Sequence, residues 1–251
     1  MRGHFLWDEE VRGLERLWLP EEECRLTLLM CLDQLGPVTD AQLEEFVARL
    51  DLIGYFDMAV NLAALIDQKQ IIRERHPAGL LLFVSGNGGQ ALDAFRNRIP
   101  ASRRAAIEAQ ALEWRTRFKR SLQAPCRIEG KRAYCMLVES GTVLVEFALS
   151  LPEGTKPSAF RERWEAAAPG LWRQITAALY GDGRIPEKMP EEVRWEQRTV
   201  SESGHLTLPP AHPGSLQLQL TLDEEEDARR CAANWFLCRD ELEKALLTAL
   251  L

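Results

Sequence analysis

Six cysteines and four histidines are the residues of this sequence best suited to binding a metal or acting as nucleophiles. The cysteines form no CxxC pair, and the histidines have no metal-ligand spacing to them, so the sequence predicts no metal site. Cys24 and Cys31 are seven residues apart on a predicted helix, and so are Cys231 and Cys238. This spacing puts each pair on one helical face, which is typical of buried, reduced thiols.

Motifs of common enzymes are absent, because the sequence contains no HExxH, no nucleophile elbow and no Walker motif. Its acidic residues come in solvated runs, at 21–23 and 223–227, and not as single acids in apolar surroundings. The glycine-rich segment 85–90 precedes a predicted helix, as phosphate-binding loops do, but it lacks their Lys-Ser/Thr ending. A turn into a helix explains it better. We therefore expect no catalytic residues, no enzyme activity and no cofactor.

The charge of the chain is unevenly distributed around its net value of −7. Residues 1–70 hold 6 Lys/Arg and 14 Asp/Glu, a net charge of −8. Residues 71–135, which we call the basic belt, hold 13 and 5, a net charge of +8, and residues 136–251 hold 12 and 19, a net charge of −7. Electrostatic binding of any partner therefore depends on where the basic belt lies. No apolar run reaches transmembrane length, and the apolar opening is too short for a signal peptide, so we expect a cytoplasmic protein without membrane contact.

Residues 39–84 have the pattern of a helix, a turn, a second helix and a two-stranded wing. Thr39 and Gln42 have the spacing of a capping box, segment 51–54 is the turn, and a helix follows Tyr55-Phe56. Segments 71–75 and 80–84 are predicted strands. Amphipathic helices are predicted before them, at 5–20 and from 21 to the stop at Gly36-Pro37. Three helices followed by a hairpin is the order of a winged helix-turn-helix, a fold that usually binds DNA.

The rest of the chain predicts a linker and a repeat. A basic linker helix at 101–121 follows a winged-helix domain at 1–100 and precedes a domain at 122–251. That domain repeats at an offset of 71 residues, in copies 122–180 and 193–251, so that Trp164 lies over Trp235 and Arg127 over Arg198. Each copy consists of short strands and a helix. The predicted fold class is α+β, an N-terminal winged helix-turn-helix followed by an internally duplicated α+β domain of two strand-strand-helix repeats.

Three further features carry a family resemblance: Tyr55-Phe56 at the start of an apolar helix, the stretch 97–100 (Asn-Arg-Ile-Pro), and Asn234-Trp235 in the last helix. Together they resemble an uncharacterised bacterial winged-helix family that is catalogued as a domain of unknown function. The resemblance spans most of the chain. It implies the winged-helix fold and a role in transcriptional regulation, and it implies no catalytic residues and no known ligand.

The first functional hypothesis is a transcriptional regulator, expected as a homodimer, that binds double-stranded DNA mainly through its phosphates. On a helical wheel, the helix after Tyr55 turns two aspartates and two apolar residues to the side opposite its apolar stripe, which makes it a poor base reader. Bases would be read by Asn61 and Gln68, next to Lys69, and phosphates would be held by Arg73, Arg75, Arg103 and Arg104.

The alternative hypothesis is a non-enzymatic protein–protein interaction module that uses the same recognition face. Its candidate contact residues are Val60 and Ala64, with Asp57 and Asp67 beside them. A small-molecule site or a dimer contact in the duplicated domain is compatible with either hypothesis.

Overall fold

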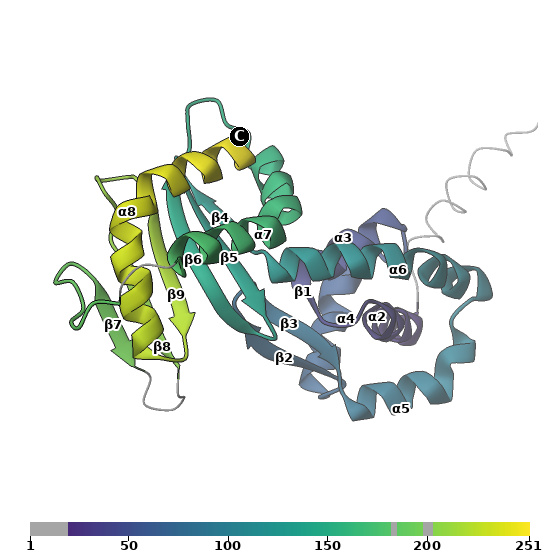
Figure 1. Cartoon of the computed structure of the whole chain (residues 1–251). Helices are drawn as coiled ribbons and strands as arrows, with labels where there is room; N and C mark the ends of the chain where they lie inside the picture. Colours follow the sequence, from purple (N-terminus) through teal and green to yellow (C-terminus); the bar gives the residue numbers. More distant parts are fainter. Residues whose placement is uncertain (1–19, 182–184, 198–202) are drawn as a thin grey trace, which may run out of the picture. The chain divides into compact units, whose positions relative to one another are not determined.

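The computed structural model describes residues 20–181, 185–197 and 203–251 (Figure 1). The chain forms two compact units, of which the first ends at Lys119 and the second begins at Arg120. The helix predicted at 5–20 and the predicted match of Arg127 to Arg198 fall outside the described residues. Both units combine helices with strands, so the predicted α+β class is confirmed.

The first unit consists of helices around a small sheet. Its elements are α2 (Glu21–Leu35), β1 (Val38–Thr39), α3 (Asp40–Arg49), α4 (Tyr55–Asp67), β2 (Ile71–His76), β3 (Gly79–Val84), α5 (Gly86–Phe95), the 3-10 helix η1 (Arg96–Arg98) and α6 (Ala101–Gln123), which continues into the second unit. The described strands of this unit pair antiparallel in the order β1-β3-β2. A helix, a turn, a second helix and a hairpin therefore lie where the sequence predicts them.

A capping box starts helix α3, as the sequence predicts. The Thr39 hydroxyl accepts a hydrogen bond from the Gln42 backbone N–H (3.3 Å), and the Gln42 side chain accepts one from the Thr39 N–H (2.9 Å). These two bonds satisfy donors that have no partner inside the helix. The helix then buries Leu43, Phe46 and Val47 against the core of the unit.

Helix α2 forms the centre of the first core. Leu28 and Cys31 are fully enclosed, and helix α6 packs Ile107, Trp114 and Phe118 into the same cluster. The rings of Trp114 and Phe118 are 5.3 Å apart in an edge-to-face arrangement, which is favourable for aromatic pairs. The helix predicted as a linker at 101–121 thus contributes three of its side chains to the core of the first unit.

The glycine-rich segment 85–90 begins helix α5. The Ser85 hydroxyl accepts a hydrogen bond from the Gly88 backbone N–H (3.1 Å) and donates one to the Lys69 carbonyl (2.7 Å). A Cβ atom at Gly88 would lie 2.2 Å from the Gln70 carbonyl oxygen, so only glycine allows this approach of two backbones. The segment is the turn into a helix that the sequence favours.

The second unit is a sheet with two long helices. Its elements are β4 (Cys126–Glu129), β5 (Arg132–Glu139), β6 (Thr142–Ser150), α7 (Pro157–Leu179), β7 (Arg194–Gln197), β8 (Gly204–Leu208), β9 (Gln217–Leu222) and α8 (Glu225–Leu250). The described strands form one antiparallel sheet in the order β4-β5-β6-β9-β8-β7. The same order of elements, strands and then a helix, therefore occurs in both halves of the unit, and β6 and β9 meet at the centre of the sheet.

The core of the second unit lies between the sheet and its two helices. Along strands β6 and β9, buried residues alternate with more exposed ones. The buried residues Phe147 and Leu218 are opposite each other in the register. Helices α7 and α8 pack on the face that these residues share (Figure 1) and contribute the fully buried Trp164 and Trp235. Burial of one face explains the strict alternation of apolar residues along these strands.

Candidate functional site

One side of helix α4 faces the core of the first unit, and Asn61 lies on it. The apolar residues of this side recur at helical spacing and are Met58, Leu62 and Leu65. Asn61 is 3% exposed, so its predicted place on the side opposite the apolar stripe, from which it would read bases, is wrong. Its amide nitrogen donates to the Asp57 carbonyl (2.8 Å), and its amide oxygen accepts from Arg25 Nε (3.1 Å). Asn61 lies three residues after Met58 and four before Leu65, and this helical spacing is the signal of burial that sequence reasoning missed.

We expect Asn61→Ala to lower the free energy of unfolding of the first unit by about 2 kcal/mol, because Arg25 and the Asp57 carbonyl each lose a hydrogen-bond partner at a partly buried position. Gln68→Ala is the matched control. It removes an exposed amide from the end of the same helix, and its effect should stay within about 0.5 kcal/mol. Native-state hydrogen exchange of the α2 amides measures both changes. Equal effects of the two substitutions would contradict the structural role of Asn61.

The opposite side of helix α4 is exposed and mostly apolar. Phe56 is 82% exposed, Val60 65% and Tyr55 62%. We call this side the α4 face, and its residues are Tyr55, Phe56, Ala59, Val60, Ala63 and Asp67. The rings of Tyr55 and Phe56 contact each other edge to face, with centroids 5.6 Å apart. A group of large apolar side chains that remains in solvent is typical of a binding surface.

A shallow groove with a volume of about 320 Å³ runs along the α4 face. Helix α3 contributes Asp40 and Glu44 to its lining, and helix α4 contributes Asp67. Arg73 from β2 also lines the groove, and its guanidinium is 3.3 Å from the Asp40 carboxylate. The charge along the groove is therefore mainly negative, which opposes the approach of DNA phosphates.

The other predicted residues of helix α4 lie at the margins of this face. Asp57 and Ala64 are half-buried, so of the four predicted protein-contact residues only Val60 and Asp67 belong to the α4 face. Gln68 is the C-terminal cap residue and is exposed. Lys69 follows it with a φ of 57°, a left-handed conformation that carries the chain out of the helix.

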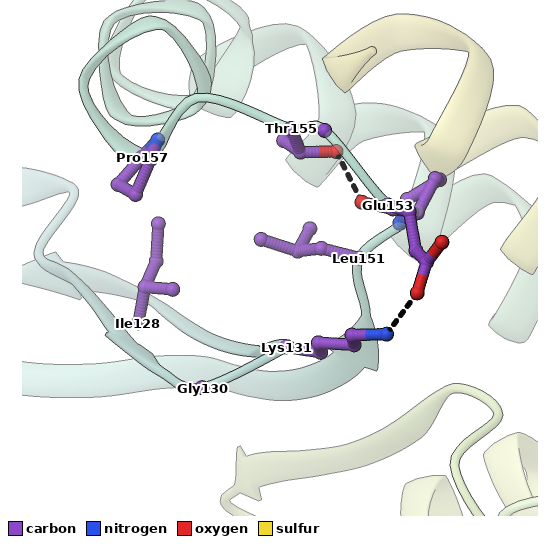
Figure 2. Close-up of a pocket in the computed structure, with 9 residues that line it drawn as sticks. Ile128, Gly130, Lys131, Leu151, Glu153, Thr155 and Pro157 are labelled. Carbon is purple, nitrogen blue, oxygen red and sulfur yellow. Dashed lines mark hydrogen bonds and ion pairs between the residues drawn. The ribbon is translucent and has the colours of Figure 1, made fainter.

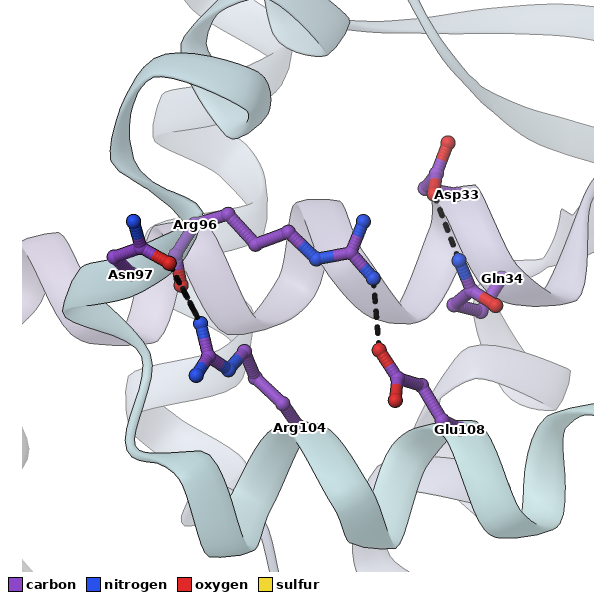
Figure 3. A network of polar contacts seen from close by, with 6 residues as sticks. All are labelled: Asp33, Gln34, Arg96, Asn97, Arg104 and Glu108. Atoms are coloured by element: carbon purple, nitrogen blue, oxygen red, sulfur yellow. Dashed lines mark hydrogen bonds and ion pairs between the residues drawn. The ribbon is translucent and has the colours of Figure 1, made fainter.

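The predicted phosphate-binding arginines are mostly occupied by contacts within the first unit. Arg104 donates to Asn97 Oδ1 (3.0 Å) and to the carbonyl of Arg96 (3.3 Å), as Figure 3 shows. The guanidinium of Arg96 in turn pairs with Glu108 of helix α6 (2.8 Å). These contacts fasten η1 to α6. Arg75, by contrast, is exposed near the end of the hairpin, in register with Leu80.

Two arginines of the basic belt also pair with glutamates at the start of helix α2. Arg98 lies 2.8 Å from Glu22, and Arg103 lies 3.8 Å from Glu23. Both acids belong to the first turn of helix α2. A further ion pair, 2.8 Å long, joins α6 to α3 through Arg117 and Glu45. Each exposed pair contributes only about 0–1 kcal/mol, but together they place a carboxylate beside three arginines of the basic belt, which reduces the positive charge that DNA phosphates would meet.

A pocket of about 400 Å³ lies beside the turn between β4 and β5 in the second unit (Figure 2). Ile128, Leu151 and Pro157 supply apolar lining. Lys131 and Glu153 form an ion pair with each other, and the Thr155 hydroxyl donates to the Pro152 carbonyl. The polar side chains of the pocket are thus bound to neighbours in the pocket wall.

Residues 20–181, 185–197 and 203–251 contain neither a metal-binding cluster nor a membrane-spanning helix. This part of the chain holds no group of three or more His, Cys, Asp or Glu side chains that could bind a metal ion. The helices described there include none with the length and apolar character that crossing a membrane requires.

Comparison with known proteins gives one family. Neither the curated proteins nor the solved structures contain a match to the chain. A family model described as "Domain of unknown function (DUF4364)" matches residues 24–179, which is more than half of the chain. The match extends from helix α2 to the end of helix α7 and so includes the α4 face, whereas Asn234-Trp235 lies beyond it. The chain belongs to the family of the domain of unknown function DUF4364.

Proposed function

We propose that the first unit is a winged helix that binds a protein partner through the α4 face. The observation that supports this best is the composition of that face. Three large apolar side chains are more than 60% exposed, the other members are two alanines and one aspartate, and the groove beside them is acidic. A helix that reads DNA presents Arg, Lys, Asn or Gln to the bases, and the α4 face has none of these residues.

The charges around the α4 face favour a particular class of partner. Asp40, Glu44 and Asp67 line the groove beside the exposed aromatic residues. A complementary surface combines aliphatic or aromatic side chains with Lys or Arg around them. A second copy of the same face would bring these carboxylates against their own symmetry mates. The proposed partner is therefore a different protein, with a basic and amphipathic segment.

The proposal predicts that Val60→Arg strongly weakens partner binding and leaves the fold intact, because Val60 is exposed and its loss removes no core contact. The probes are peptides selected from a displayed random library for binding to the protein. We expect the selected peptides to combine Lys/Arg with apolar residues, and Val60→Arg to weaken their binding by about 30-fold or more, as truncation of a central contact does.

Leu237→Arg is the matched control, since Leu237 is 83% exposed on helix α8 of the second unit. It introduces the same charge at an even more exposed apolar position and should leave peptide binding unchanged. Circular dichroism should show wild-type helix content for both variants. Selected peptides that are acidic, or that bind Val60→Arg as well as the wild type, would contradict the proposal.

The second candidate function is a transcriptional regulator that binds DNA through phosphates, and the exposed cations at the end of α4 and on the hairpin favour it. Lys69 and Arg75 are exposed, and neither forms an ion pair within the described part of the chain. DNA binding of this type weakens steeply with salt, and Arg75→Ala weakens it for every sequence. Absence of binding to a pool of genomic fragments at low salt would exclude it.

A further inference from the structure

Cys126 and Cys135 face each other across two neighbouring strands of the second unit. Cys126 is the first residue of the edge strand β4 and is directly opposite Cys135 of β5 in the register. The two Sγ atoms are 3.5 Å apart, and the Cys135 thiol donates to the Cys126 sulfur. Cys135 is fully buried, whereas Cys126 is half-buried.

The backbone geometry allows these two sulfurs to form a bond. The Met136 backbone N–H donates to the Pro125 carbonyl (2.9 Å), so residues 125 and 136 are a hydrogen-bonded pair and the next pair, Cys126 and Cys135, is not. In non-hydrogen-bonded antiparallel pairs the Cα atoms are about 4.5 Å apart, which lies within the roughly 4.4–6.8 Å that disulfides span.

The surroundings shift the pKa values of the two cysteines in opposite directions. The hydrogen bond from Cys135 lowers the pKa of the Cys126 thiol, with support from Arg161 of helix α7, although burial and Glu165 act against it. The same hydrogen bond and burial raise the pKa of Cys135. Burial also raises the pKa of Cys24 to about 11 and of Cys231 to about 12. Cys126 is therefore the cysteine that most readily forms a thiolate, and the thiolate is the reactive form.

We propose that Cys126 and Cys135 are a dithiol redox site that hydrogen peroxide oxidises to a reversible disulfide joining β4 to β5. The Cys126 thiolate attacks one peroxide oxygen, the O–O bond breaks, and Cys126 sulfenic acid and hydroxide form. The Cys135 sulfur then attacks the Cys126 sulfur. An S–S bond forms, the S–O bond breaks, and the thiol proton leaves with the hydroxyl group as water. The two thiols lose two electrons in total, and peroxide is reduced to water.

The half-buried position of Cys126 makes the reaction reversible. A dithiol reductant reaches the Cys126 sulfur, releases Cys135 as the leaving thiol and restores the reduced pair by exchange. Oxidation ties the edge strand β4 covalently to the sheet, and reduction leaves it held by backbone hydrogen bonds and packing. The pair can therefore report the redox state of its surroundings through the attachment of one strand.

The test treats the reduced full-length protein with hydrogen peroxide, blocks free thiols with a maleimide and digests the protein with trypsin. Cleavage after Arg127, Lys131 and Arg132 separates the two cysteines, so the disulfide is seen as a linked pair of peptides. We expect this pair to form, to disappear with dithiothreitol, and Cys126 to react at least about tenfold faster than Cys238, the other half-buried cysteine. No linked pair, or equal rates for Cys126 and Cys238, would overturn the proposal.

Two variants separate the roles of the cysteines. Cys135→Ser keeps a donor for the Cys126 thiolate but removes the second sulfur, so Cys126 should accumulate as a sulfenic acid that dimedone traps. Cys135→Ala removes the donor as well and should slow alkylation of Cys126 by about tenfold relative to Cys135→Ser, the factor expected for a hydrogen bond to a charged group. Equal alkylation rates would show that the hydrogen bond does not activate Cys126. The comparison of the reaction rates of Cys126 and Cys238 uses the wild-type protein. It therefore tests the proposal even if Cys135→Ser or Cys135→Ala disturbs folding.

Discussion

Gly88→Ala is expected to lower the free energy of unfolding of the first unit by about 3 kcal/mol. A methyl group at this position would lie 2.2 Å from the Gln70 carbonyl oxygen and 3.1 Å from a methyl group of Val84. The Gln70 oxygen is backbone and already accepts a hydrogen bond from the Ser85 N–H (2.9 Å). Relief of the clash therefore requires the start of α5 to move away from the segment that joins α4 to the hairpin.

Gly89→Ala is the control for this substitution. Its Cβ atom would meet no atom within 4 Å, and alanine is favoured over glycine inside a helix by about 1 kcal/mol. Gly89→Ala should therefore be neutral or stabilising. Native-state hydrogen exchange of the α2 amides gives both free energies. If Gly88→Ala is as stable as the wild type, the backbones of the two segments do not approach as described.

Trp235→Phe should destabilise the second unit by about 3 kcal/mol, and by about 1–2 kcal/mol more than Trp164→Phe. Both tryptophans are fully buried in the same core and lose the same indole volume. The indole N–H of Trp235 donates to the Pro209 carbonyl (2.8 Å), so its removal leaves a carbonyl without a partner. The indole N–H of Trp164 is buried and has no hydrogen-bond partner in the described residues.

The residue 71 positions before Pro209 is Val138, where the register between β5 and β6 shifts. The two halves of the unit thus differ at the position that supplies the hydrogen-bond acceptor to Trp235. Hydrogen exchange of the β6 and β9 amides measures the stability of both variants. Equal losses for Trp164→Phe and Trp235→Phe would show that the Pro209 hydrogen bond contributes nothing to the difference.

The elements of the fold could be predicted from the sequence because their signals are local. The capping box at Thr39 and Gln42 begins a helix by itself, and the alternation of strands β6 and β9 follows from burial of one sheet face. The matching positions of Trp164 and Trp235 in the two copies likewise indicate two helices that each pack a tryptophan into the core of the second unit. The position of helix α6 in the first core could have been read from the narrow stripe that Ile107, Trp114 and Phe118 form.

The candidate site could be predicted only in part, because the partner of a charged or polar side chain is set by distant residues. Arg98 and Glu22 are 76 positions apart, and no local pattern indicates that they pair. Five of the nine basic belt residues that lie in the first unit form ion pairs within its described part, and composition alone does not reveal these pairs. The burial of Asn61 is hard to predict for a different reason. A polar residue inside an apolar stripe is assigned to the solvent side unless its partner, here the half-buried Arg25, is known.

The central claim is that the α4 face contacts a protein. The most direct measurement places a photoreactive benzoylphenylalanine at position 56, which is 82% exposed in that face, and irradiates the full-length protein in its native cells. The same group at position 237 is the control. The account predicts a crosslink to one protein from position 56 and none from position 237, with the crosslinked peptide carrying Lys or Arg beside apolar residues. Crosslinks from position 56 to DNA alone, or the same protein crosslinked from both positions, would contradict it.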